Sequence, residues 1–435
     1  MKNFPVPRGT NDILPSEIPL WLNVESKARH LLRTYGYQEI RTPLFEETEL
    51  FARSMGETSD VVQKQMLNLA ASHREDAEKT TSASLSLRPE STAAVVRSYI
   101  QHHFDQKENL TKLFYIGPMF RGERPQKGRL RQFHQIGVEA IGPESSLAYL
   151  DAEVISLSVH LLRSLGLKNF RLKLNTLGSP DDKKEFSRQL REELRNKISD
   201  LCEDCQGRFE RNVFRILDCK NKTCREIVSR INIGHSYLSQ ESQVYYVQVK
   251  EALESLGIVF EESFNLVRGL DYYTHTVFEI TDSSLGSQDA LGAGGRYNNL
   301  VSQLGGPQAD AVGFALGVER ILLAMAPDGV IQEAPLTVYM IAMNEESYRK
   351  AFEILHLFRG QGISADMNYR LASMKSQMRS ANKIGARYVA ILGEEELRQN
   401  AVTVKDMTSG TQETIAVENL TKVFKEKNFV IHNHE

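Results

Sequence analysis

The spacing of apolar residues divides the chain into segments with different periods. From 16 to 35, apolar residues recur at helical spacing and Gly36 follows, which predicts an amphipathic helix. The next segment, YQEIRTPLFEETELF, is predicted to be extended and, because Pro43 cannot donate to a ladder, to lie at an edge or an interface. The small polar residues of 70 to 84 predict a flexible loop. SLSLRPE then predicts a strand, and STAAVVRSYIQHHF a helix capped by Ser91.

Two antiparallel strands are predicted at 113–120 and 131–142, joined by the basic turn PQKGR. Because side chains alternate along a strand, the returning strand has one largely apolar face that can meet a core, with His134, Ile136, Val138 and Ala140. The opposite face carries a cation, an aromatic ring, an amide and a carboxyl group, from Arg131, Phe133, Gln135 and Glu139. On the outgoing strand, Arg121 and Glu123 share one parity and are predicted to join this second face, which is therefore a candidate binding platform.

Beyond the hairpin the pattern changes twice. From about 180 to 262 it is helical and strongly charged with no strand of note, which indicates an insertion. Strand patterns resume at FNLVRGLDYYTHTVFEI, and the segments LGAGGRYNNLV and AVGFALGVERILLAM predict glycine-rich strand ends that lead into helices. Residues 327–335 read as a linker between a domain at 1–326 and a domain at 336–435. The second domain alternates strands and helices over about 100 residues and is predicted to be α/β.

Length and charge narrow the class of protein. A chain of 435 residues exceeds one ordinary core, so several domains are expected. No apolar run reaches the length of a membrane span, and the N-terminus lacks the apolar core of a signal peptide, so we expect a cytoplasmic protein. The formal net charge is -3, yet five Lys or Arg and one acid fall within 120–137. This concentration indicates an anion-binding surface, although a solvated face with salt bridges stays an alternative.

The residue types on the platform suit a nucleotide. Arg121 can neutralise a phosphate with a planar fork, Phe133 can stack on a base, and Glu123 can accept from an exocyclic amine. Gln135 and Glu139 can hydrogen-bond a small polar group. The turn projects beyond the sheet, where a longer polyanion could reach Arg124, Gln126, Lys127 and Arg129.

Other polar clusters point the same way. RGLDYYTHT (268–276) places an Arg, an Asp and two Tyr on a short strand or turn. The glycines of GAGGRYNN (292–299) allow close approach of backbone to a ligand, although a tight turn explains them equally well. Arg320 lies at the start of an apolar helix, where a cation is unfavourable to the helix dipole, which suggests an external anion.

Two further groups leave alternatives open. The chain's four cysteines, Cys202, Cys205, Cys219 and Cys224, have one CxxC spacing typical of metal ligands and one looser spacing. They are either a structural zinc site or reduced thiols of a small subdomain. A predicted helix at 371–385 and the residues after it carry four cations at four-residue spacing, Lys375, Arg379, Lys383 and Arg387. These are predicted to lie along one face, as either a solvated basic surface or an RNA contact.

Several of these segments resemble the motifs of class II aminoacyl-tRNA synthetases. YQEIRTPLFEETELF resembles the first motif, GPMFRGERPQKGRLRQFHQIGVE the second and AVGFALGVERILLAM the third. LVRGLDYYTHTVFE and GAGGRYNNL resemble segments of the histidine-specific family. The resemblance covers essentially the whole chain. It implies an α+β catalytic domain with an antiparallel sheet, a helical insertion, and a C-terminal α/β anticodon-binding domain.

The resemblance also implies a role for each candidate residue. It assigns ATP to Arg121, Glu123, Arg129, Phe133 and Arg320. It assigns histidine to Glu90, Thr92, Gln135, Glu139, Arg268, Tyr272, Tyr273 and Tyr297. It implies that Arg121, Arg268 and Arg320 are catalytic. It assigns tRNA to Arg124, Gln126 and Lys127 of the turn and to Lys375, Arg379, Lys383 and Arg387.

The implied activity is histidine–tRNA ligation. Histidine and ATP would form histidyl-adenylate and pyrophosphate with Mg²⁺, before transfer to the histidine tRNA by a homodimer. Two alternatives stay open: a catalytically silent regulatory subunit of ATP phosphoribosyltransferase, and a class II synthetase for another amino acid such as proline or threonine. Ser91, Gly122 and Asn298 depart from the family's usual residues, and their effect on ligand affinity is open.

Overall fold

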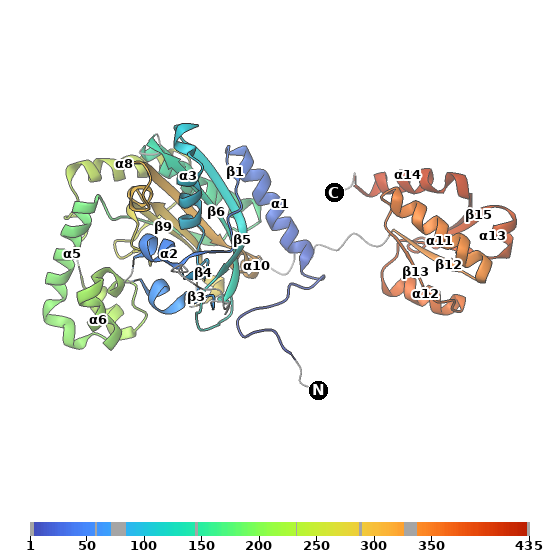
Figure 1. Ribbon diagram of the computed structural model, residues 1–435, viewed down its shortest axis with the longest axis horizontal. Helices are drawn as coiled ribbons and strands as arrows, with labels where there is room; N and C mark the ends of the chain where they lie inside the picture. Colours follow the sequence, from blue (N-terminus) through green and yellow to red (C-terminus); the bar gives the residue numbers. More distant parts are fainter. Residues whose placement is uncertain are drawn as a thin grey trace, which may run out of the picture. The chain divides into compact units, whose positions relative to one another are not determined.

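The computed structural model describes residues 4–56, 59–70, 84–143, 147–231, 233–286, 289–325 and 337–432, with side chains up to 426. The chain divides into two compact units, Met1–Val330 and Ile331–Glu435 (Figure 1). The predicted linker 327–335 and nearly all of the predicted loop 70–84 lie outside the described residues.

An eight-stranded sheet forms the centre of the first unit. Its strands, in spatial order, are β1 Gln38–Glu39, β5 Thr111–Phe120, β6 Gln132–Gly142, β11 Asp310–Gly317, β10 Ala290–Arg296, β9 Thr274–Asp282, β7 Phe170–Thr176 and β8 Glu261–Glu262. The six central strands pair antiparallel, while β1 and β8 add parallel at the edges. The antiparallel catalytic sheet and the predicted hairpin are therefore confirmed.

Four helices share one hydrophobic core with this sheet: α1 Ile18–Thr34, α4 Ala148–Ser164, α8 Gln240–Ser255 and α10 Val318–Ala324. Ile136, Val138 and Ala140 of β6 are fully buried in that core, so the predicted apolar face is confirmed. The predicted first helix is confirmed as α1, whose Val24, Ala28 and Leu32 are buried at helical spacing.

The second core lies under α2 Thr48–Met55 and α3 Thr92–Gln101, next to a small sheet of β2 Phe45–Glu47, β4 Leu85–Leu87 and β3 Leu67–Asn68. The prediction that YQEIRTPLFEETELF is extended throughout is wrong. Only β1 and β2 are strands, and the chain turns helical at Thr48, because Phe51 and Met55 are buried together one helical turn apart. Pro43 follows the edge strand β1, where a missing donor costs no ladder bond.

The cap of α3 also differs from the prediction. Ser91 occupies the N-cap position, but its side chain makes no capping hydrogen bond. The carboxyl group of Glu90 takes that role and accepts from the backbone N–H groups of Thr92 at 2.7 Å and Ala93 at 2.9 Å. A carboxylate at a helix start also suits the helix dipole, so Glu90 stabilises both the backbone and its own charge.

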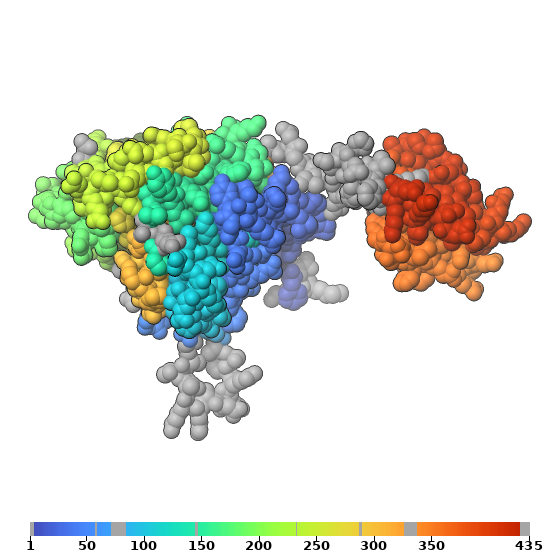
Figure 2. All heavy atoms as spheres, turned by 90° about the horizontal axis from the view of Figure 1, so that it is seen from above, coloured from blue at the N-terminus to red at the C-terminus, as the bar shows by residue number. Residues whose placement is uncertain are grey.

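The predicted insertion contains short helices, namely α5 Pro180–Leu194, α6 Glu203–Arg211 and α7 Lys222–Val228, with 3-10 turns at Arg195–Asp200 and Val213–Ile216. In Figure 2 the segment around 180–260 (green to yellow) occupies one end of the first unit. Its core is continuous with that of α3. The last helix of the predicted range, α8, instead packs against α4 in the core of the catalytic body.

The second unit is built on the sheet β13 Ala365–Met367, β12 Val338–Ala342, β14 Tyr388–Leu392, β15 Ala401–Asp406 and β16 Gln412–Ala416, in that order. Its helices are α11 Glu345–Gly360, α12 Met374–Lys383, α13 Glu394–Arg398 and α14 Leu420–His432. The predicted alternation of strands and helices is confirmed, but β16 and α13 are not in the prediction. Both are short and largely exposed, so they lack a strong apolar period. Among the described residues, no helix combines the length and apolarity that crossing a bilayer requires.

We expect Arg296→Leu to destabilise the first unit by on the order of 3 kcal/mol, because it leaves a buried carboxylate without its cation. Arg296 is fully buried, and its guanidinium pairs with the equally buried Asp151. Unfolding in urea is followed by fluorescence of Trp21, the chain's single tryptophan, which is buried in this unit. The control Arg53→Leu removes an exposed pair with Glu49 and should cost less than about 0.5 kcal/mol. Equal losses for the two variants would contradict the assignment.

Candidate active site

The hairpin of β5 and β6 carries the centre of the candidate site. The pairs Met119–Phe133, Gly117–Gln135 and Leu113–Glu139 place the predicted platform residues of β6 along one face. Arg121 and Glu123 lie beyond the end of β5, yet the Arg121 guanidinium is 5.3 Å from the centre of the Phe133 ring and 3.9 Å from the Glu123 carboxylate, so the prediction that they join this platform is confirmed. Arg121 is placed by other bonds: its backbone N–H donates to the Arg131 carbonyl and its Nε to the Pro89 carbonyl, both at 2.8 Å.

The carboxyl group of Glu139 is buried at the bottom of the site. It accepts from the Thr92 hydroxyl at 2.7 Å, from the Tyr115 hydroxyl at 3.5 Å, and from the Tyr297 hydroxyl. Burial raises the pKa of Glu139 to about 8, and the three hydroxyl groups only partly oppose this. Burial likewise raises the pKa of Glu90, which lies at the start of the same helix as Thr92. The site thus holds two carboxyl groups whose charged forms need a cationic partner.

Three tyrosines line the same region. The rings of Tyr272 and Tyr273 lie 4.6 Å apart, and the Tyr272 ring lies 5.5 Å from that of Tyr297. Burial raises the pKa of all three hydroxyl groups, so they remain neutral donors. The structure therefore brings together the predicted residues Glu90, Thr92, Glu139 and these tyrosines around one polar space.

Arg268 borders this space and is held by Glu279 of β9 at 2.8 Å. Burial alone would lower the pKa of Arg268, but Glu279 together with Tyr273 and Asp218 outweighs burial and raises this pKa, so Arg268 stays charged. Two predicted contact atoms, Arg268 Nε and Gln135 Oε1, are buried and have no partner among the described residues. Because buried polar atoms are nearly always hydrogen-bonded, both atoms point to a ligand.

A second group of cations lies at the other end of the hairpin. The guanidinium of Arg121 is 5.3 Å from the centre of the Phe133 ring, and Arg129 pairs with Glu123 at 2.7 Å. Burial lowers the pKa of Arg121, against the opposing charges of Glu123 and Glu90. Burial and then the neighbouring Arg129 lower the pKa of Arg320. Three guanidinium groups close together in a partly buried place favour an anion.

Helix α10 positions Arg320 through the residue before it. The Glu319 carboxylate accepts from the backbone N–H and from the ring of His134, each at 2.9 Å, which ties the helix start to β6 beside Phe133. Arg320 in turn donates to the carbonyl groups of Gly128, at 3.1 Å, and Ala290. Its guanidinium therefore bridges the hairpin turn and strand β10, which β11 separates from the hairpin in the sheet.

The residues predicted to bind tRNA lie in two places, the hairpin turn and α12 with the segment after it, and all but Arg387 are exposed there. In the hairpin turn, Arg124, Gln126 and Lys127 are exposed. On α12, Lys375, Arg379 and Lys383 are exposed along the helix. The prediction that Arg387 extends this helical face is wrong, because α12 ends at Lys383 and Arg387 pairs with Asp406 at 3.3 Å and with Thr408. The four predicted cysteines lie together in the insertion.

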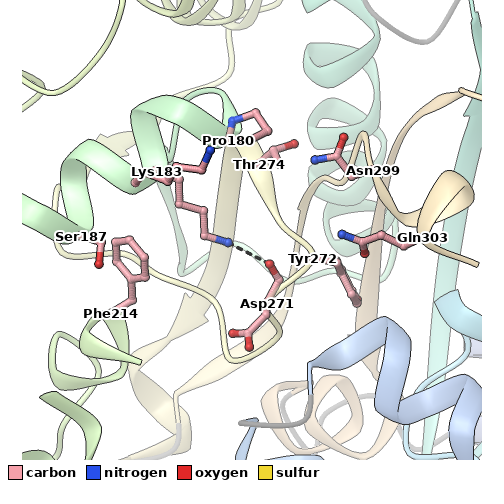
Figure 3. A pocket seen from close by; sticks show the side chains of 10 residues that line it. Pro180, Lys183, Ser187, Phe214, Asp271, Tyr272, Thr274, Asn299 and Gln303 are labelled. Carbon is pink, nitrogen blue, oxygen red and sulfur yellow. Dashed lines mark hydrogen bonds between the residues drawn. The ribbon is translucent and has the colours of Figure 1, made fainter. Parts of the chain in front are cut away.

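A cavity of about 320 Å³ lies beside the site, between the insertion and the catalytic body. Its lining includes Lys183, Phe214, Asp271, Tyr272, Asn299 and Gln303 (Figure 3). Lys183 crosses it to donate to the backbone carbonyls of Asp271, at 2.8 Å, and Tyr273, at 3.1 Å. Apart from Tyr272, these are not the predicted ligand residues. Lys183 therefore helps to position the segment of Tyr272 and Tyr273 from the side of this cavity.

Sequence reasoning did not assign Tyr115, Glu279, Glu319 or Arg88 to the site. Arg88 donates to the carbonyl groups of Pro118, at 3.0 Å, and Thr42, at 3.1 Å, which joins the first motif to β5. These supporting residues become visible only when distant strands are paired; the strand parity of Tyr115 is the one signal the sequence offered.

The three departures from the family's usual residues each find a local place. The Ser91 hydroxyl is buried and has no hydrogen-bond partner in the part of the chain that the structure describes. Gly122 donates its N–H to the Gln65 carbonyl at 2.6 Å, and Asn298 accepts from Arg296 at 3.1 Å. None of them displaces a side chain of the site.

Comparison with known proteins agrees with this geometry. The family model for histidyl-tRNA synthetase matches residues 9–321, and that for the anticodon binding domain matches residues 337–427. The histidine–tRNA ligase of Lysinibacillus sphaericus is 45% identical over 98% of this chain and 100% of its own length. That of Bacillus cytotoxicus is 43% identical over 97% of this chain and 99% of its own.

Solved structures agree as well. Apo histidyl-tRNA synthetase from S. aureus superposes with a TM-score of 0.79 at 38% identity, covering 97% of this chain and 100% of that one. A Bacillus halodurans structure titled as an ATP phosphoribosyltransferase regulatory subunit/histidyl-tRNA synthetase has a TM-score of 0.63 at 22% identity, covering 90% of this chain and 99% of that one. At that identity, the second likeness concerns the fold alone.

The antiparallel sheet, its hairpin motif and the C-terminal domain define a class II aminoacyl-tRNA synthetase. Within that class, the chain belongs to the histidyl-tRNA synthetase family.

The raised pKa of Glu139 makes stability depend on pH in a defined direction. Because the folded protein keeps this proton up to about pH 8, whereas the unfolded chain loses it at the lower pKa of an ordinary carboxyl, rising pH favours unfolding. Glu139→Gln has no such proton. Between pH 5 and 8, we expect the unfolding free energy of Glu139→Gln minus that of wild type to rise by about 1 kcal/mol for each pH unit. Urea unfolding of both proteins across this range tests this, and a pH-independent difference would contradict it.

Proposed function

We propose that this chain is a histidine–tRNA ligase, which activates histidine with ATP and transfers it to the histidine tRNA. The observation that carries the proposal is the Glu139 cluster, a buried carboxyl group surrounded by neutral hydroxyl donors. A site of this kind favours a ligand with ring nitrogens that can donate to a carboxylate. Family membership and relatives aligned over nearly the whole chain support the same reaction.

On the amino-acid side, Glu139 and Tyr273 hydrogen-bond the imidazole, and Tyr272 and Tyr297 line its pocket. Glu90 and Thr92 bind the ammonium group, with Gln135 nearby, whose buried Oε1 has no partner among the described residues. An apolar side chain offers Glu139 no donor, whereas the imidazole adds an N–H to a carboxyl group that otherwise accepts from hydroxyl groups alone. The site rejects proline by this means, so a class II enzyme for such an amino acid is disfavoured.

On the ATP side, Phe133 and Arg320 hold the adenine from its two faces, and Glu123 accepts from the adenine amine. Arg121 and Arg268 hold the α-phosphate, and Arg129 the outer phosphates. An oxygen of the histidine carboxylate attacks the α-phosphorus, the bond to the bridging oxygen breaks, and pyrophosphate leaves with that electron pair. Pro89, Glu279 and Gly128 already hold Arg121, Arg268 and Arg320, respectively. Stabilising the developing charge therefore needs little rearrangement of these side chains.

Mg²⁺ bound together with ATP would supply positive charge to the leaving phosphates. A hard cation of this kind is bound largely through phosphate oxygens and water and needs no all-protein cage. This fits the described residues, whose one group of three or more close metal-ligating side chains is the cluster of four cysteines. We further propose that the protein acts in the cytoplasm as a homodimer with the segment around Pro43 at the interface.

The regulatory-subunit alternative is disfavoured by two observations. The arginines proposed for catalysis, Arg121, Arg268 and Arg320, are all present and held in place. The chain also carries a complete second unit that matches the anticodon binding domain.

The proposal is tested by ATP–pyrophosphate exchange with each of the twenty amino acids, without tRNA. We expect exchange with histidine alone. We expect Arg268→His to lower that exchange at least about 100-fold, because a cation facing the developing charge is lost. Glu279→Gln, which keeps Arg268, serves as the matched variant and should lose much less. Absence of exchange from folded wild-type protein would overturn the ligase, and unchanged exchange in Arg268→His would overturn the role of Arg268.

The basic surface of α12 is proposed to bind tRNA. Replacing Lys375, Arg379 and Lys383 together with Ala should raise the KM for tRNA about 10-fold and leave exchange without tRNA unchanged. Arg387→Ala is the matched control, because this cation is already paired with Asp406 and should change the KM little. An unchanged KM in the triple variant would assign these cations to solvent.

A further inference from the structure

The four cysteines of the insertion form one compact sulfur cluster. Cys202, Cys205, Cys219 and Cys224 are the only cysteines of the chain, and their Sγ atoms all lie within 4.8 Å of one another. Cys205 and Cys224 are buried, while Cys202 and Cys219 are half-buried. The proposed reaction uses none of them.

The sulfur spacing is that of a metal site rather than of a disulfide. Zinc–sulfur bonds of about 2.3 Å at tetrahedral angles place neighbouring sulfur atoms about 3.8 Å apart. The Sγ atoms of Cys202 and Cys219 lie 3.8 Å apart, whereas a disulfide would bring two of them to about 2.0 Å. Four sulfur atoms at such separations can surround one ion at roughly equal distances.

Local backbone structure orients these ligands. Cys202 is the N-cap residue of α6 and Cys205 lies in its first turn, while Cys219 and Cys224 lie on either side of the start of α7. The side-chain oxygen of Asn221 accepts from the N–H of Cys224 at 3.4 Å and so holds this turn. The backbone N–H of Cys202 donates to the Cys224 Sγ at 3.2 Å. Such second contacts to a sulfur ligand set its orientation and stabilise its negative charge.

A link between α6 and α7 would stabilise this part of the insertion. Helices α6 and α7 have 9 and 7 residues, too few to be stable by themselves. The buried apolar side chains of this small module are few: Leu201, Phe209, Val213, Ile216, Leu217 and Val228. These side chains belong to the core that continues into α3, and a metal link would add to this packing by fixing α6 and α7 to each other.

We propose that Cys202, Cys205, Cys219 and Cys224 bind one zinc ion as four thiolates. Binding displaces the thiol protons, and the closed set of four sulfur ligands leaves no position for a substrate. The site is therefore structural. Zinc, as a metal without redox chemistry and with a preference for tetrahedral sulfur, fits this set better than Mg²⁺ or Ca²⁺.

The ion would hold the stretch of the insertion that reaches the catalytic body. Between the second and third cysteines, Arg208 and Arg215 both bind Asp60, at 3.0 and 2.8 Å. In the same stretch, Asn212 donates to the side chain of Asp271 at 2.8 Å, directly before the two tyrosines of the site. Zinc thus connects the fold of the insertion to the position of that segment.

The test is metal analysis of the full-length protein purified without chelators. We expect about one zinc per chain by mass spectrometry of the metal. With a chromogenic zinc chelator present, modification of the four thiols should release that zinc in the ratio of four thiols to one ion. Cobalt substituted for zinc should show the visible absorption of a tetrahedral thiolate site. Neither readout depends on the ligase activity, so the failure of one proposal leaves the other standing.

Variants assign the metal to these residues. Cys219→Ser and Cys224→Ser should each lower the zinc content severalfold and raise hydrogen exchange across 201–228. Lys220→Ser is the matched control, since this exposed residue lies between two ligands and the change keeps all four thiols. Zinc retained by both cysteine variants would overturn the assignment. If these variants fail to fold, the wild-type measurements decide: free thiols or disulfides with less than about 0.1 zinc per chain would overturn the proposal.

Discussion

The carboxyl group of Glu139 can remain buried because hydroxyl groups from three different parts of the first unit hydrogen-bond to it. Thr92 begins α3, Tyr115 belongs to β5, and Tyr297 follows β10. Gly313 on the neighbouring strand leaves the space, since a Cβ there would lie 2.0 Å from a Glu139 oxygen. One polar group therefore sets the relative positions of a helix and of strands far apart in the sequence.

The opposite end of the hairpin is organised by repulsion. Burial and then the neighbouring Arg129 disfavour the charge of Arg320, while burial and, more weakly, Arg129 disfavour the charge of Arg121, which Glu123 partly opposes. The triphosphate of ATP, proposed to bind here, would offset this cost. The protein thus maintains, at some expense of stability, an arrangement that stabilises negative charge at the moment it develops.

The insertion contacts the segments that carry the candidate site. Lys183 and Asn212 hold the backbone and side chain of Asp271, and the arginines around them hold Asp60. Because the tyrosine segment depends on contacts from a module with a small core, whatever stabilises that module also stabilises the pocket. Loss of structure in the insertion would remove these contacts and so change how the tyrosines of the site are held.

Local periodicity predicted the hairpin, the apolar face of β6, the first helix and the alternating second unit, because it indicates which face of an element is buried. The resemblance to a known family also supplied the candidate residues of the site. Contacts in the folded chain, which periodicity does not reveal, show that Glu90 caps α3, that the first motif turns helical at Thr48, that Arg387 lies off the helical face, and that the four cysteine sulfur atoms lie together. Periodicity does not indicate which distant surface an element packs against. Each of these outcomes depends on that surface.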